Sequence, residues 1–525
     1  MNIVNILNNV ADAYPQVPAI IDTHKGLSRT TTFAELEKSA AKVSTLLRQN
    51  GLQKGDAVLI FYPMSAELYI TLLALFRLGL IAMFLDPSAG KKHIEYCCSL
   101  YQPQALIASD KAHLLRLRSP ALRHIPLKFV IGFPLPGAIS WKIAKKLEPD
   151  SEIVPCQPDT PALITFTSGS TAQPKAALRT HGFLLAQYQV LSQTLQLKAK
   201  DIDLATLPIF VFANLAAGLT TLIPNVDLRT PGKTSVKPAI AQILTHKPSR
   251  TVASPGFLSV LAEYCQEQGL TLPSLEKIFI GGAPVMPRIL STLQQIAPNA
   301  EIEIVYGSTE AEPIAHISYQ NIPPADIAAT LAGRGLLVGK PVSAIQLKII
   351  SSSWGKPITS YTSLEFDAAC LPAENPGEIV VSGNHVLPGY LYGHGNDQTK
   401  FTVNGTPWHR TGDAGYIDTQ GQLWLLGRCL GCIKDVDGTL YPLEVEGILQ
   451  NYPGIRRSAV VLHQRNRILL VELDKKRAFE VNWKKLEQYA ANMHIKTVKV
   501  CRHLPVDKRH NAKIDYPTLM KLLEG

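Results

Sequence analysis

Short apolar runs alternate with helix-like stretches along the first 330 or so residues of the chain. The run Ala57–Tyr62 predicts a buried strand, and Glu67–Gly79 predicts a helix. Ile81–Leu85 predicts a second strand, which ends where Asp86-Pro87 breaks the pattern. This order and spacing are typical of a βαβ unit with two parallel strands. We therefore expect an α/β architecture built around a mostly parallel sheet.

The same pattern recurs along this part of the chain, with helical segments between many of the runs. Thr32 precedes a helix that we expect to reach about Gln49, with Gly51 as its stop. Further strands are predicted at Ala105–Ala108, Phe129–Ile131, Ala162–Phe166, Leu204–Leu207, Thr251–Ser254, Ile278–Ile280 and Ile302–Tyr306. The layered α/β part is thus expected to run to about residue 330.

The pattern changes beyond that point. Short strands joined by Gly/Pro turns predict a small β-rich subdomain over about 331–427, at Gln346–Ser351, Gly377–Ser382, Gly415–Asp418 and Leu423–Leu426. Residues 428–525 mix predicted strands at Arg456–His463 and Ile468–Glu472 with helices at Leu440–Gln450, Trp483–Met493 and Tyr516–Leu523. We expect an N-terminal domain over 1–427 and a small, mobile α+β C-terminal lid domain over 428–525.

Composition fits a globular protein of several domains, with 525 residues, 46% hydrophobic and 18% charged. A net charge of +10 favours anionic partners. Basic residues are dense at Lys111–Arg123, Lys142–Lys146 and Lys475–Arg509. A solvated basic surface explains them most simply; phosphates of a nucleotide or coenzyme A, or an anionic membrane surface, are the alternatives. No nucleic-acid recognition motif is present, so we expect no nucleic-acid partner beyond a nucleotide.

The cysteines and the N-terminus favour a cytoplasmic protein. Cys429 and Cys432 form a single C-x-x-C pair without a second ligand pair at zinc spacing. The first residues lack the basic and apolar regions of a signal peptide. Glu67 and Arg77 interrupt the most lipophilic region, Ala57 to Leu85, so we expect no membrane span there, although peripheral membrane contact is compatible with the sequence.

Candidate chemistry is concentrated at Phe166–Lys175, directly after the predicted strand Ala162–Phe166. Its four hydroxyl side chains, glycine and lysine suit close contact with a phosphate chain. It is not a Walker loop, because Pro174 precedes the lysine and Ala176-Ala177 follow it. The alternative is a Ser/Thr-rich surface turn. We interpret the loop as part of a nucleotide-using enzyme.

Five later blocks follow this loop in a recognisable order. They are Gly281-Gly282-Ala283-Pro284, Tyr306-Gly307-Ser308-Thr309-Glu310, Trp408-His409-Arg410-Thr411-Gly412-Asp413, Gly427-Arg428 and Pro505–Ile514. Together with the loop they resemble the adenylate-forming superfamily of acyl-CoA synthetases, luciferases and peptide-synthetase adenylation domains, over about residues 30–520. In the stretches Trp408–Asp418, Asp437–Tyr441 and Arg509–Ile514 the chain is most similar to the β-lactone synthetases of bacterial olefin biosynthesis. Fatty acid–CoA ligases are a close second.

The resemblance implies a reaction in which a carboxylate attacks the α-phosphate of ATP to give acyl-AMP and pyrophosphate. By this resemblance, Lys513, Glu310 and Thr309 are catalytic, and Glu310 and Thr167 hold Mg²⁺. Lys513 bridges the carboxylate and the α-phosphate, and Thr309 touches that phosphate. The residues that bind ATP are Thr167, Ser168, Gly169, Ser170, Thr171, Lys175, Gly281, Gly282, Ala283, Tyr306, Gly307, Asp413 and Arg428.

Each nucleotide-binding block has its own implied part. The loop Thr167–Lys175 holds the β- and γ-phosphates. Tyr306 stacks on adenine, and Gly281–Ala283 line the adenine slot. Asp413 accepts both ribose hydroxyls, a role that suits a carboxylate and a vicinal diol. Arg428 binds ribose or phosphate.

Two departures from the family pattern affect substrate and acceptor. Leu207–Asn214 lacks the histidine that many relatives carry there, which favours an apolar pocket for a fatty or β-hydroxy acid. Leu430 stands at the hinge position where Asp or Lys is usual, and Gly431 is a candidate pivot. The second step is therefore open between β-lactone closure and thioester formation with coenzyme A. An alternative function is that of a weakly catalytic paralogue that binds a nucleotide or lipid. Association with a biosynthetic complex, and an oligomeric state, are compatible with the sequence.

Overall fold

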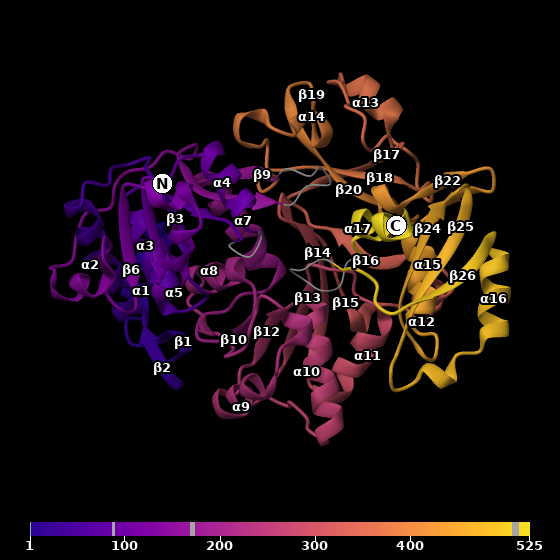
Figure 1. Cartoon of the computed structure of the whole chain (residues 1–525), viewed down its shortest axis with the longest axis horizontal. Helices are drawn as coiled ribbons and strands as arrows, with labels where there is room; N and C mark the ends of the chain where they lie inside the picture. Colours follow the sequence, from indigo (N-terminus) through magenta and orange to yellow (C-terminus); the bar gives the residue numbers. More distant parts are fainter. Residues whose placement is uncertain (1, 87–89, 168–173, 507–513, 525) are drawn as a thin grey trace. The chain divides into compact units, whose positions relative to one another are not determined.

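The computed structural model of the chain describes residues 2–86, 90–167, 174–506 and 514–524. Internal contacts divide it into two compact units, residues 1–225 with 384–397 and residues 226–383 with 398–525. Both units mix helices and strands, as the pattern of apolar positions predicted (Figure 1). The predicted domain boundary at 427/428 stays a prediction, because the second compact unit contains residues from both sides of it.

The first unit contains two groups of strands and the helices around them. Its longer helices are α1 (Val4–Ala13), α2 (Phe33–Gln49), α3 (Ala66–Arg77), α4 (Lys91–Leu100), α7 (His181–Thr194) and α8 (Pro208–Ala216). Its shorter helical segments are α5 (Asp110–His113), η2 (Leu114–Leu117), α6 (Pro120–His124), η3 (Trp141–Lys146) and η6 (Leu391–Gly393).

Seven strands of this unit form one sheet in the order β7-β6-β5-β3-β4-β8-β9. Their bounds are β3 (Ala57–Phe61), β4 (Ile81–Phe84), β5 (Ala105–Ser109), β6 (Leu127–Ile131), β7 (Ile139–Ser140), β8 (Pro161–Thr167) and β9 (Lys175–Thr180). All neighbouring pairs are parallel except β8–β9. The other strands are β1 (Pro18–His24), β2 (Leu27–Thr32), β10 (Ile202–Ala205) and β11 (Thr220–Leu222).

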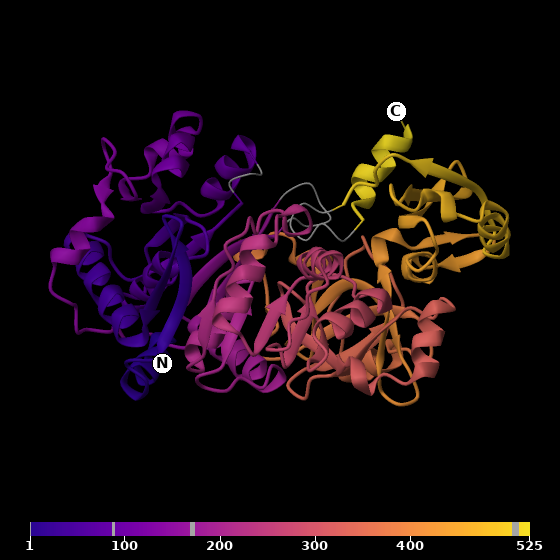
Figure 2. The same ribbon diagram turned by 90° about the horizontal axis from the view of Figure 1, so that it is seen from below.

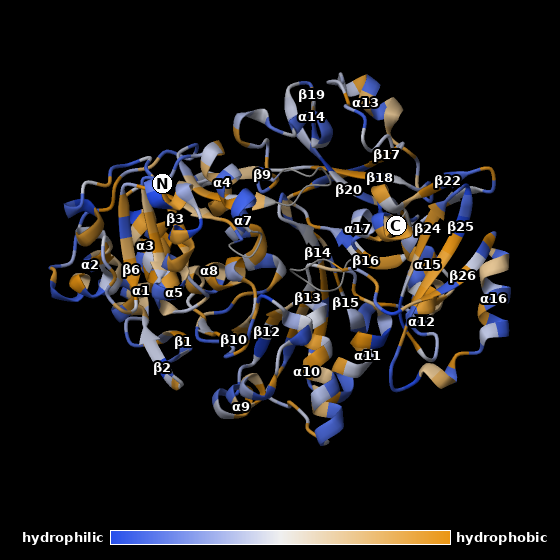
Figure 3. Cartoon of the chain, viewed as in Figure 1, coloured by the Kyte–Doolittle hydropathy of each residue, from blue (hydrophilic) through white to orange (hydrophobic). Residues whose placement is uncertain are grey.

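Helices cover both faces of the seven-stranded sheet, which explains why its central strand is apolar throughout (Figure 3). Val58 and Ile60 of β3 belong to a core shared with α2 and α3. Ala57, Leu59 and Phe61 face the opposite way, into a core shared with α4 and α6. The carboxyl ends of these parallel strands therefore meet at one edge, where the loop after β8 begins.

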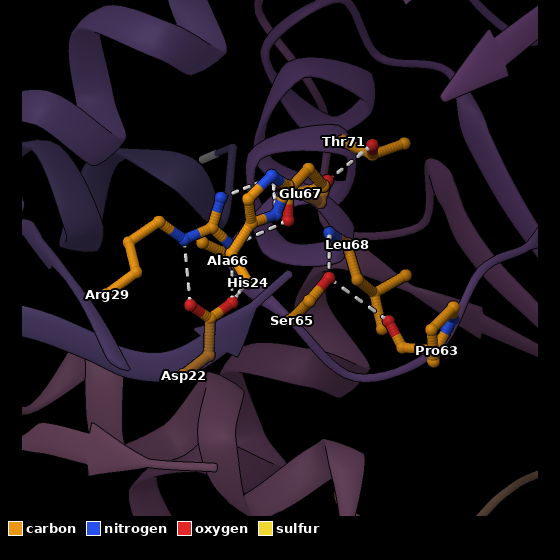
Figure 4. A network of polar contacts seen from close by, with 9 residues as sticks. All are labelled: Asp22, His24, Arg29, Pro63, Ser65, Ala66, Glu67, Leu68 and Thr71. Carbon is orange, nitrogen blue, oxygen red and sulfur yellow. Dashed lines mark hydrogen bonds and ion pairs between the residues drawn. The ribbon is translucent and has the colours of Figure 1, made fainter. Parts of the chain in front are cut away.

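A buried ionic cluster attaches the β1–β2 hairpin to the start of α3 (Figure 4). Arg29 Nε donates to Asp22 Oδ1 at 2.8 Å, and Arg29 Nη2 donates to Glu67 Oε2 at 2.8 Å. Asp22 also accepts the Ala66 backbone N–H at 2.9 Å. Burial alone would raise the pKa of Glu67, but the Arg29 guanidinium outweighs it and lowers that pKa. The two carboxylates are thus paired on one guanidinium, as buried charges must be.

The second unit carries the remaining elements. Its helices are α9 (Lys237–His246), α10 (Pro255–Gln268), α11 (Pro287–Ile296), α12 (Pro324–Leu331), α13 (Ser363–Ala369), α14 (Asn396–Thr399), which spans the boundary between the units, α15 (Pro442–Leu449), α16 (Trp483–Asn492) and α17 (Tyr516–Glu524). Its strands begin with β12 (Arg250–Ala253), β13 (Lys277–Gly281), β14 (Glu301–Ser308), β15 (Ala311–Ser318), β16 (Leu336–Pro341) and β17 (Gln346–Ile350). They continue with β18 (Gly377–Ser382), β19 (Lys400–Val403), β20 (Thr406–Ile417) and β21 (Leu423–Arg428).

These strands pair in the order β12-β13-β14-β15-β16-β21-β20-β18-β17, with β19 beside β20. Strands β12, β13 and β14 are parallel to their neighbours within this group of three, and every other neighbouring pair is antiparallel. Strands β14, β20 and β21 carry three of the sequence blocks singled out above. One continuous set of pairings therefore connects those blocks.

The C-terminal part is a three-stranded sheet with helices on both faces (Figure 2). Its strands are β24 (Ile455–His463), β25 (Asn466–Leu473) and β26 (Ile495–Cys501), preceded by the hairpin β22 (Ile433–Asp435) and β23 (Gly438–Leu440). Val460 and Leu469 pack with α15 and α16, whereas Val461 and Leu470 pack with α17. Successive side chains of these strands point to opposite faces and therefore pack against two separate layers of helices.

No helix in the described ranges is long and apolar enough to cross a membrane. The predicted strands and helices are all present, and most ends lie within a few residues of the expected positions; the exception is the strand predicted at Gly415–Asp418, which begins nine residues earlier as β20. Among the described strands, sequence patterning missed β1, β2, β7, β9, β11, β15, β16, β19, β22, β23 and β26. Strand β26 shows why: its burial pattern is mostly exposed, so no apolar face marks it.

Candidate active site

The centre of the candidate site is a carboxylate on β20 paired with an arginine on β21. Asp413 and Arg428 are register partners across these antiparallel strands. Arg428 Nη1 donates to Asp413 Oδ1 at 2.8 Å and to the Thr411 carbonyl at 3.2 Å. The Asp413 side chain is 16% exposed and the Arg428 side chain 49% exposed, so the pair faces solvent on one side. Asp413 raises the pKa of the Arg428 guanidinium further above its usual range.

Tyr306, on β14, reaches the same carboxylate from another strand. Its hydroxyl donates to Asp413 Oδ2 at 2.8 Å. Burial, the Asp413 charge and this hydrogen bond raise the pKa of Tyr306 well above its ordinary value, so the hydroxyl stays a donor. Each oxygen of Asp413 thus accepts one side-chain donor, and a carboxylate oxygen has a second lone pair. Asp413 is fixed in place while it can still accept bonds from a ligand.

Glu310 and Thr309 lie in the turn between β14 and β15. The Glu310 charge contributes to the raised pKa of Arg428, so this carboxylate interacts electrostatically with the Arg428 guanidinium. Ser308, at the end of β14, has a buried hydroxyl oxygen with no hydrogen-bond partner among the described residues. Buried hydroxyls in folded proteins are nearly always paired, so this oxygen has hydrogen-bonding capacity that no described residue uses.

Gly281 ends β13 beside β14, and its lack of a side chain has a definite cause. A Cβ on this residue would lie 2.3 Å from the Val305 carbonyl oxygen, closer than atoms can approach. Gly282 follows with φ +83°, a conformation that favours glycine. The block Gly281–Ala283 therefore forms a tight turn one strand away from Tyr306, where an aromatic base could approach the backbone.

Comparison with known proteins agrees with this arrangement. The family model described as AMP-binding enzyme matches residues 7–391. The chain belongs to the AMP-binding enzyme family. An olefin beta-lactone synthetase of Xanthomonas campestris pv. campestris is 30% identical over 92% of this chain and 89% of that protein. An olefin beta-lactone synthetase of Stenotrophomonas maltophilia is 27% identical over 92% of this chain and 90% of that protein.

The fold of this AMP-binding enzyme is shared with solved structures of low sequence identity. An anthranilate CoA ligase, solved in complex with anthranoyl-AMP, superposes with a TM-score of 0.82 at 18% identity, over 100% of this chain and 97% of that chain. These findings confirm the expected α/β fold with a large N-terminal and a small C-terminal domain. They also confirm the predicted class, an acid ligase that forms an acyl-adenylate.

Two groups of predicted site residues lie outside the described residues of the AMP-binding enzyme. The first is Ser168, Gly169, Ser170 and Thr171 of the loop, and the second is Lys513. Thr167 is described only as the last residue of β8. The roles of these residues stay predictions.

Lys175, at the other end of the loop, is described and is 5% exposed. Its ammonium donates to the Gly395 carbonyl at 3.4 Å and lies 5.5 Å from the centre of the Tyr390 ring. The structure thus gives this lysine a local role in attaching the segment 390–395 to β9. A contact with ATP phosphates stays a prediction for it.

The run Leu207–Asn214 forms the start of α8, and its apolar side chains face more than one way. Val211 and Phe212 belong to the core of the first unit, where Phe212 packs edge-on against Phe76 at 5.7 Å. Asn214 is fully buried and donates to Asp203 Oδ2 at 2.6 Å. Part of this apolar run therefore serves packing, which narrows the portion that can line an acyl pocket.

The hinge region after Arg428 is packed closely around Gly431. A Cβ there would lie 2.9 Å from Pro442 Cγ and 3.1 Å from the Tyr516 ring. Tyr516, the first residue of α17, donates its hydroxyl to Glu446 Oε1 at 2.6 Å. Burial raises the pKa of Glu446 to about 7. Gly431 is thus required for close approach, a different reason from the conformational freedom that the sequence suggested.

The pair Cys429 and Cys432 flanks this glycine. Burial raises the pKa of the Cys432 thiol to about 12 and that of Cys429 further still. Neither thiol is a ready nucleophile or ligand, since both need the thiolate form. The pair therefore belongs to the packing of the hinge.

Sequence reasoning missed Ser308, the buried Arg410 and the partners of the latter. Arg410 lies three residues before Asp413 and forms a bidentate pair with Glu378 on β18, at 3.0 and 2.6 Å. Both side chains are fully buried. Arg410 Nη1 also donates to the Lys356 carbonyl at 2.7 Å. The available signal was Arg410 itself, since a charge inside an otherwise buried strand needs a partner.

Proposed function

We propose that this enzyme activates a fatty or β-hydroxy fatty acid with ATP and then closes it to a β-lactone. The observation that carries the proposal is Asp413, held by Arg428 and Tyr306 with lone pairs left to accept a ribose diol. The similarity to two olefin beta-lactone synthetases over 92% of the chain supports the choice of product.

The first step joins two anions. A carboxylate oxygen of the acid attacks the α-phosphorus of ATP, and the bond to the bridging oxygen of pyrophosphate breaks. We assign binding of the negatively charged phosphate and carboxylate to Arg428, Thr309 and Lys513. Tyr306 and the turn Gly281–Ala283 are assigned to the adenine.

The donor set at the turn after β14 fits a magnesium ion, since a hard carboxylate such as Glu310 suits Mg²⁺ shared with phosphate oxygens. Glu310 and Thr167 are the residues that we assign to it. A bound Mg²⁺ would neutralise phosphate charge during the transfer.

In the second step the β-hydroxyl oxygen attacks the acyl carbon, the acyl–phosphate C–O bond breaks, and AMP leaves as the hydroxyl proton is lost. No second acceptor enters. Thioester formation with coenzyme A is the alternative, and it requires a domain rotation about the hinge. At the hinge, Gly431 is packed closely against Pro442 and Tyr516, so a rotation there would have to break these contacts.

The test supplies ATP, Mg²⁺ and a 2-alkyl-3-hydroxy acid, with and without coenzyme A, and identifies products by mass spectrometry. We expect pyrophosphate, AMP and a β-lactone without coenzyme A. A product that forms only with coenzyme A would establish the ligase instead. Binding of ATP without pyrophosphate release for any acid would favour a nucleotide-binding paralogue.

We also propose that the enzyme acts in the cytoplasm. The eight cysteines are all free, which fits a reducing compartment. Cell fractionation followed by immunoblotting tests this.

A further inference from the structure

One long segment of the first unit is basic without interruption. Residues 111–147 contain eight Lys and Arg and no Asp or Glu, which is most of the net charge of +10. The segment covers α5, η2, α6, β6, β7 and η3, at the β7 edge of the seven-stranded sheet. The proposed chemistry uses none of it, so the charge calls for a separate explanation.

The same segment exposes large apolar side chains. Leu114 is 60% exposed, Leu117 74% and Phe133 77%. Leu114 and Leu117 are the first and last residues of the 3₁₀ segment η2, and residues three apart lie on the same face of such a helix. Exposed Leu and Phe set among Lys and Arg are the composition of surfaces that lie in a membrane interface.

Hydrogen bonds hold these exposed residues in one surface. The loop after β6 is attached to α5, because the Phe133 backbone N–H donates to Asp110 Oδ2 at 3.3 Å. Arg116 Nη2 donates to the Pro136 carbonyl at 3.2 Å, which joins η2 to the same loop. Helix α5 also contacts strands β5 and β6 (Figure 1). We name Lys111, Leu114, Leu117, Arg118, Arg123 and Phe133 the basic-apolar surface.

The anchoring of this surface is internal. Leu115 and Leu122 point into the core shared with β3 and α4. Arg123 Nη2 donates to the Leu117 carbonyl at 3.2 Å and so closes the end of η2. The exposed leucines are therefore displayed on a fixed support, so their exposure does not result from a loose loop.

Charges on neighbouring elements leave the surface positive. The half-buried Asp110 accepts hydrogen bonds from the Lys111 and Phe133 backbone N–H groups. Helix α4, which packs against α6, adds Lys91 and Lys92, and its Glu95 lies 3.8 Å from Lys91. An anionic surface is complementary to this field, at roughly 1 kcal/mol per Lys or Arg near an acidic membrane.

We propose that the basic-apolar surface docks this enzyme on anionic phospholipid membranes, with Leu114, Leu117 and Phe133 entering the interface and Lys111, Arg118 and Arg123 contacting the headgroups. Its large apolar side chains are more than half exposed, and this distinguishes it from a purely basic surface that would attract an acidic protein by charge alone. The inference does not depend on the proposed reaction, since docking requires neither ATP nor an acid.

The test is sedimentation of the full chain with large vesicles of pure phosphatidylcholine or of phosphatidylcholine with one quarter phosphatidylglycerol. We expect binding to the anionic vesicles, little to the neutral ones, and a marked loss in high salt. The double variant Leu117→Ser/Phe133→Ser should bind at least about tenfold less, because it loses the burial of two large apolar side chains. Arg118→Glu should also weaken binding, by more than the about fivefold expected for loss of one positive charge.

Leu27→Ser is the matched control, since Leu27 is also 74% exposed but lies on β2 outside the basic segment. It should bind like the wild type. All variants carry exposed substitutions, and circular dichroism verifies that they fold. Absence of binding to anionic vesicles would overturn the proposal, as would equal loss in the Leu27 control. Binding that depends on Arg118 but not on Leu117 and Phe133 would overturn the insertion of the apolar side chains.

Discussion

Two arginine–carboxylate pairs lie three residues apart along β20 and serve different ends. Arg410 and Glu378 are fully buried and bidentate, and Arg410 also binds a backbone carbonyl. Arg428 and Asp413 meet through one donor and are partly open to solvent. Each oxygen of both carboxylates accepts one side-chain donor, but Glu378 is enclosed with Arg410, whereas Asp413 remains accessible to a ligand. Access to solvent, more than the type of residue, separates a structural pair from a binding pair.

A third carboxylate extends the comparison. No cation among the described residues pairs with Glu446; the Tyr516 hydroxyl donates to it, and burial raises its pKa to about 7. Burial also raises the pKa of Glu378, and the Arg410 guanidinium opposes this. A carboxyl group can thus be kept buried either by a guanidinium or by a proton.

The largest effect should come from breaking the buried pair. Arg410→Ala leaves Glu378 buried without its partner, which should lower the free energy of unfolding by about 3–5 kcal/mol. Urea denaturation followed by circular dichroism measures this. The control is Lys91→Ala, which removes the exposed i,i+4 pair with Glu95 and should cost about 1 kcal/mol or less. Equal costs for the two variants would contradict the distinction between them.

The open pair should respond more in activity than in stability. Asp413→Asn keeps the shape of the side chain but loses the charge that the ribose hydroxyls would meet. We expect kcat/KM for ATP to fall about tenfold to a hundredfold, and the unfolding free energy to fall by only about 1–2 kcal/mol, since the amide can accept from only one of the donors Arg428 and Tyr306. The exposed Asp227→Asn serves as the control for ATP use. A stable variant with full activity would show that Asp413 is not the ribose ligand.

Glu446→Gln tests the carboxyl that is kept by a proton. Because its folded pKa of about 7 is above the usual 4.5, protonation stabilises the fold at low pH, and this stability is lost as pH rises through about 7. Glutamine cannot ionise, so the variant should match wild type near pH 4 and exceed it by roughly 3 kcal/mol near pH 8.5. Thermal melts at the two pH values measure this; an equal difference at both would contradict the assignment.

The smallest effect is expected from Tyr306→Phe. It removes one of the two side-chain donors to Asp413 and leaves the ring that is assigned to adenine. A neutral hydrogen bond is worth about 1 kcal/mol, so the KM for ATP should rise about fivefold or less, with kcat nearly unchanged. Steady-state kinetics with saturating acid checks this. An effect as large as that of Asp413→Asn would mean that Tyr306 does more than position the carboxylate.

The sequence predicted the fold well because its central strands are buried on both faces and read as continuous apolar runs, as β3 does. The order of the motif blocks also indicated which strands carry the site, and β14, β20 and β21 do bring Tyr306, Asp413 and Arg428 together. Side-chain partners could not be predicted in the same way. Nothing in the local pattern connects Arg410 with Glu378, which is 32 residues away and meets it only through the pairing of β18 with β20.

Gly431 shows a similar limit. A glycine in a hinge suggests freedom of the backbone, but here the decisive contact is with Tyr516, 85 residues further along the chain. Close approach between distant segments has no local signature. The same holds for the Ser308 hydroxyl, whose lack of a partner among the described residues becomes visible only when the strands are assembled.

The most direct test of the account is isotope exchange between pyrophosphate and ATP, which occurs only if the enzyme forms an acyl-adenylate reversibly. We predict exchange that requires both Mg²⁺ and a long-chain 3-hydroxy acid, that survives in Asp227→Asn, and that is largely lost in a folded Asp413→Asn variant. Exchange at the wild-type rate in the folded Asp413→Asn variant, or no exchange with any acid in the wild type, would contradict the claim that Asp413 and Arg428 form the nucleotide site of an acid-activating enzyme.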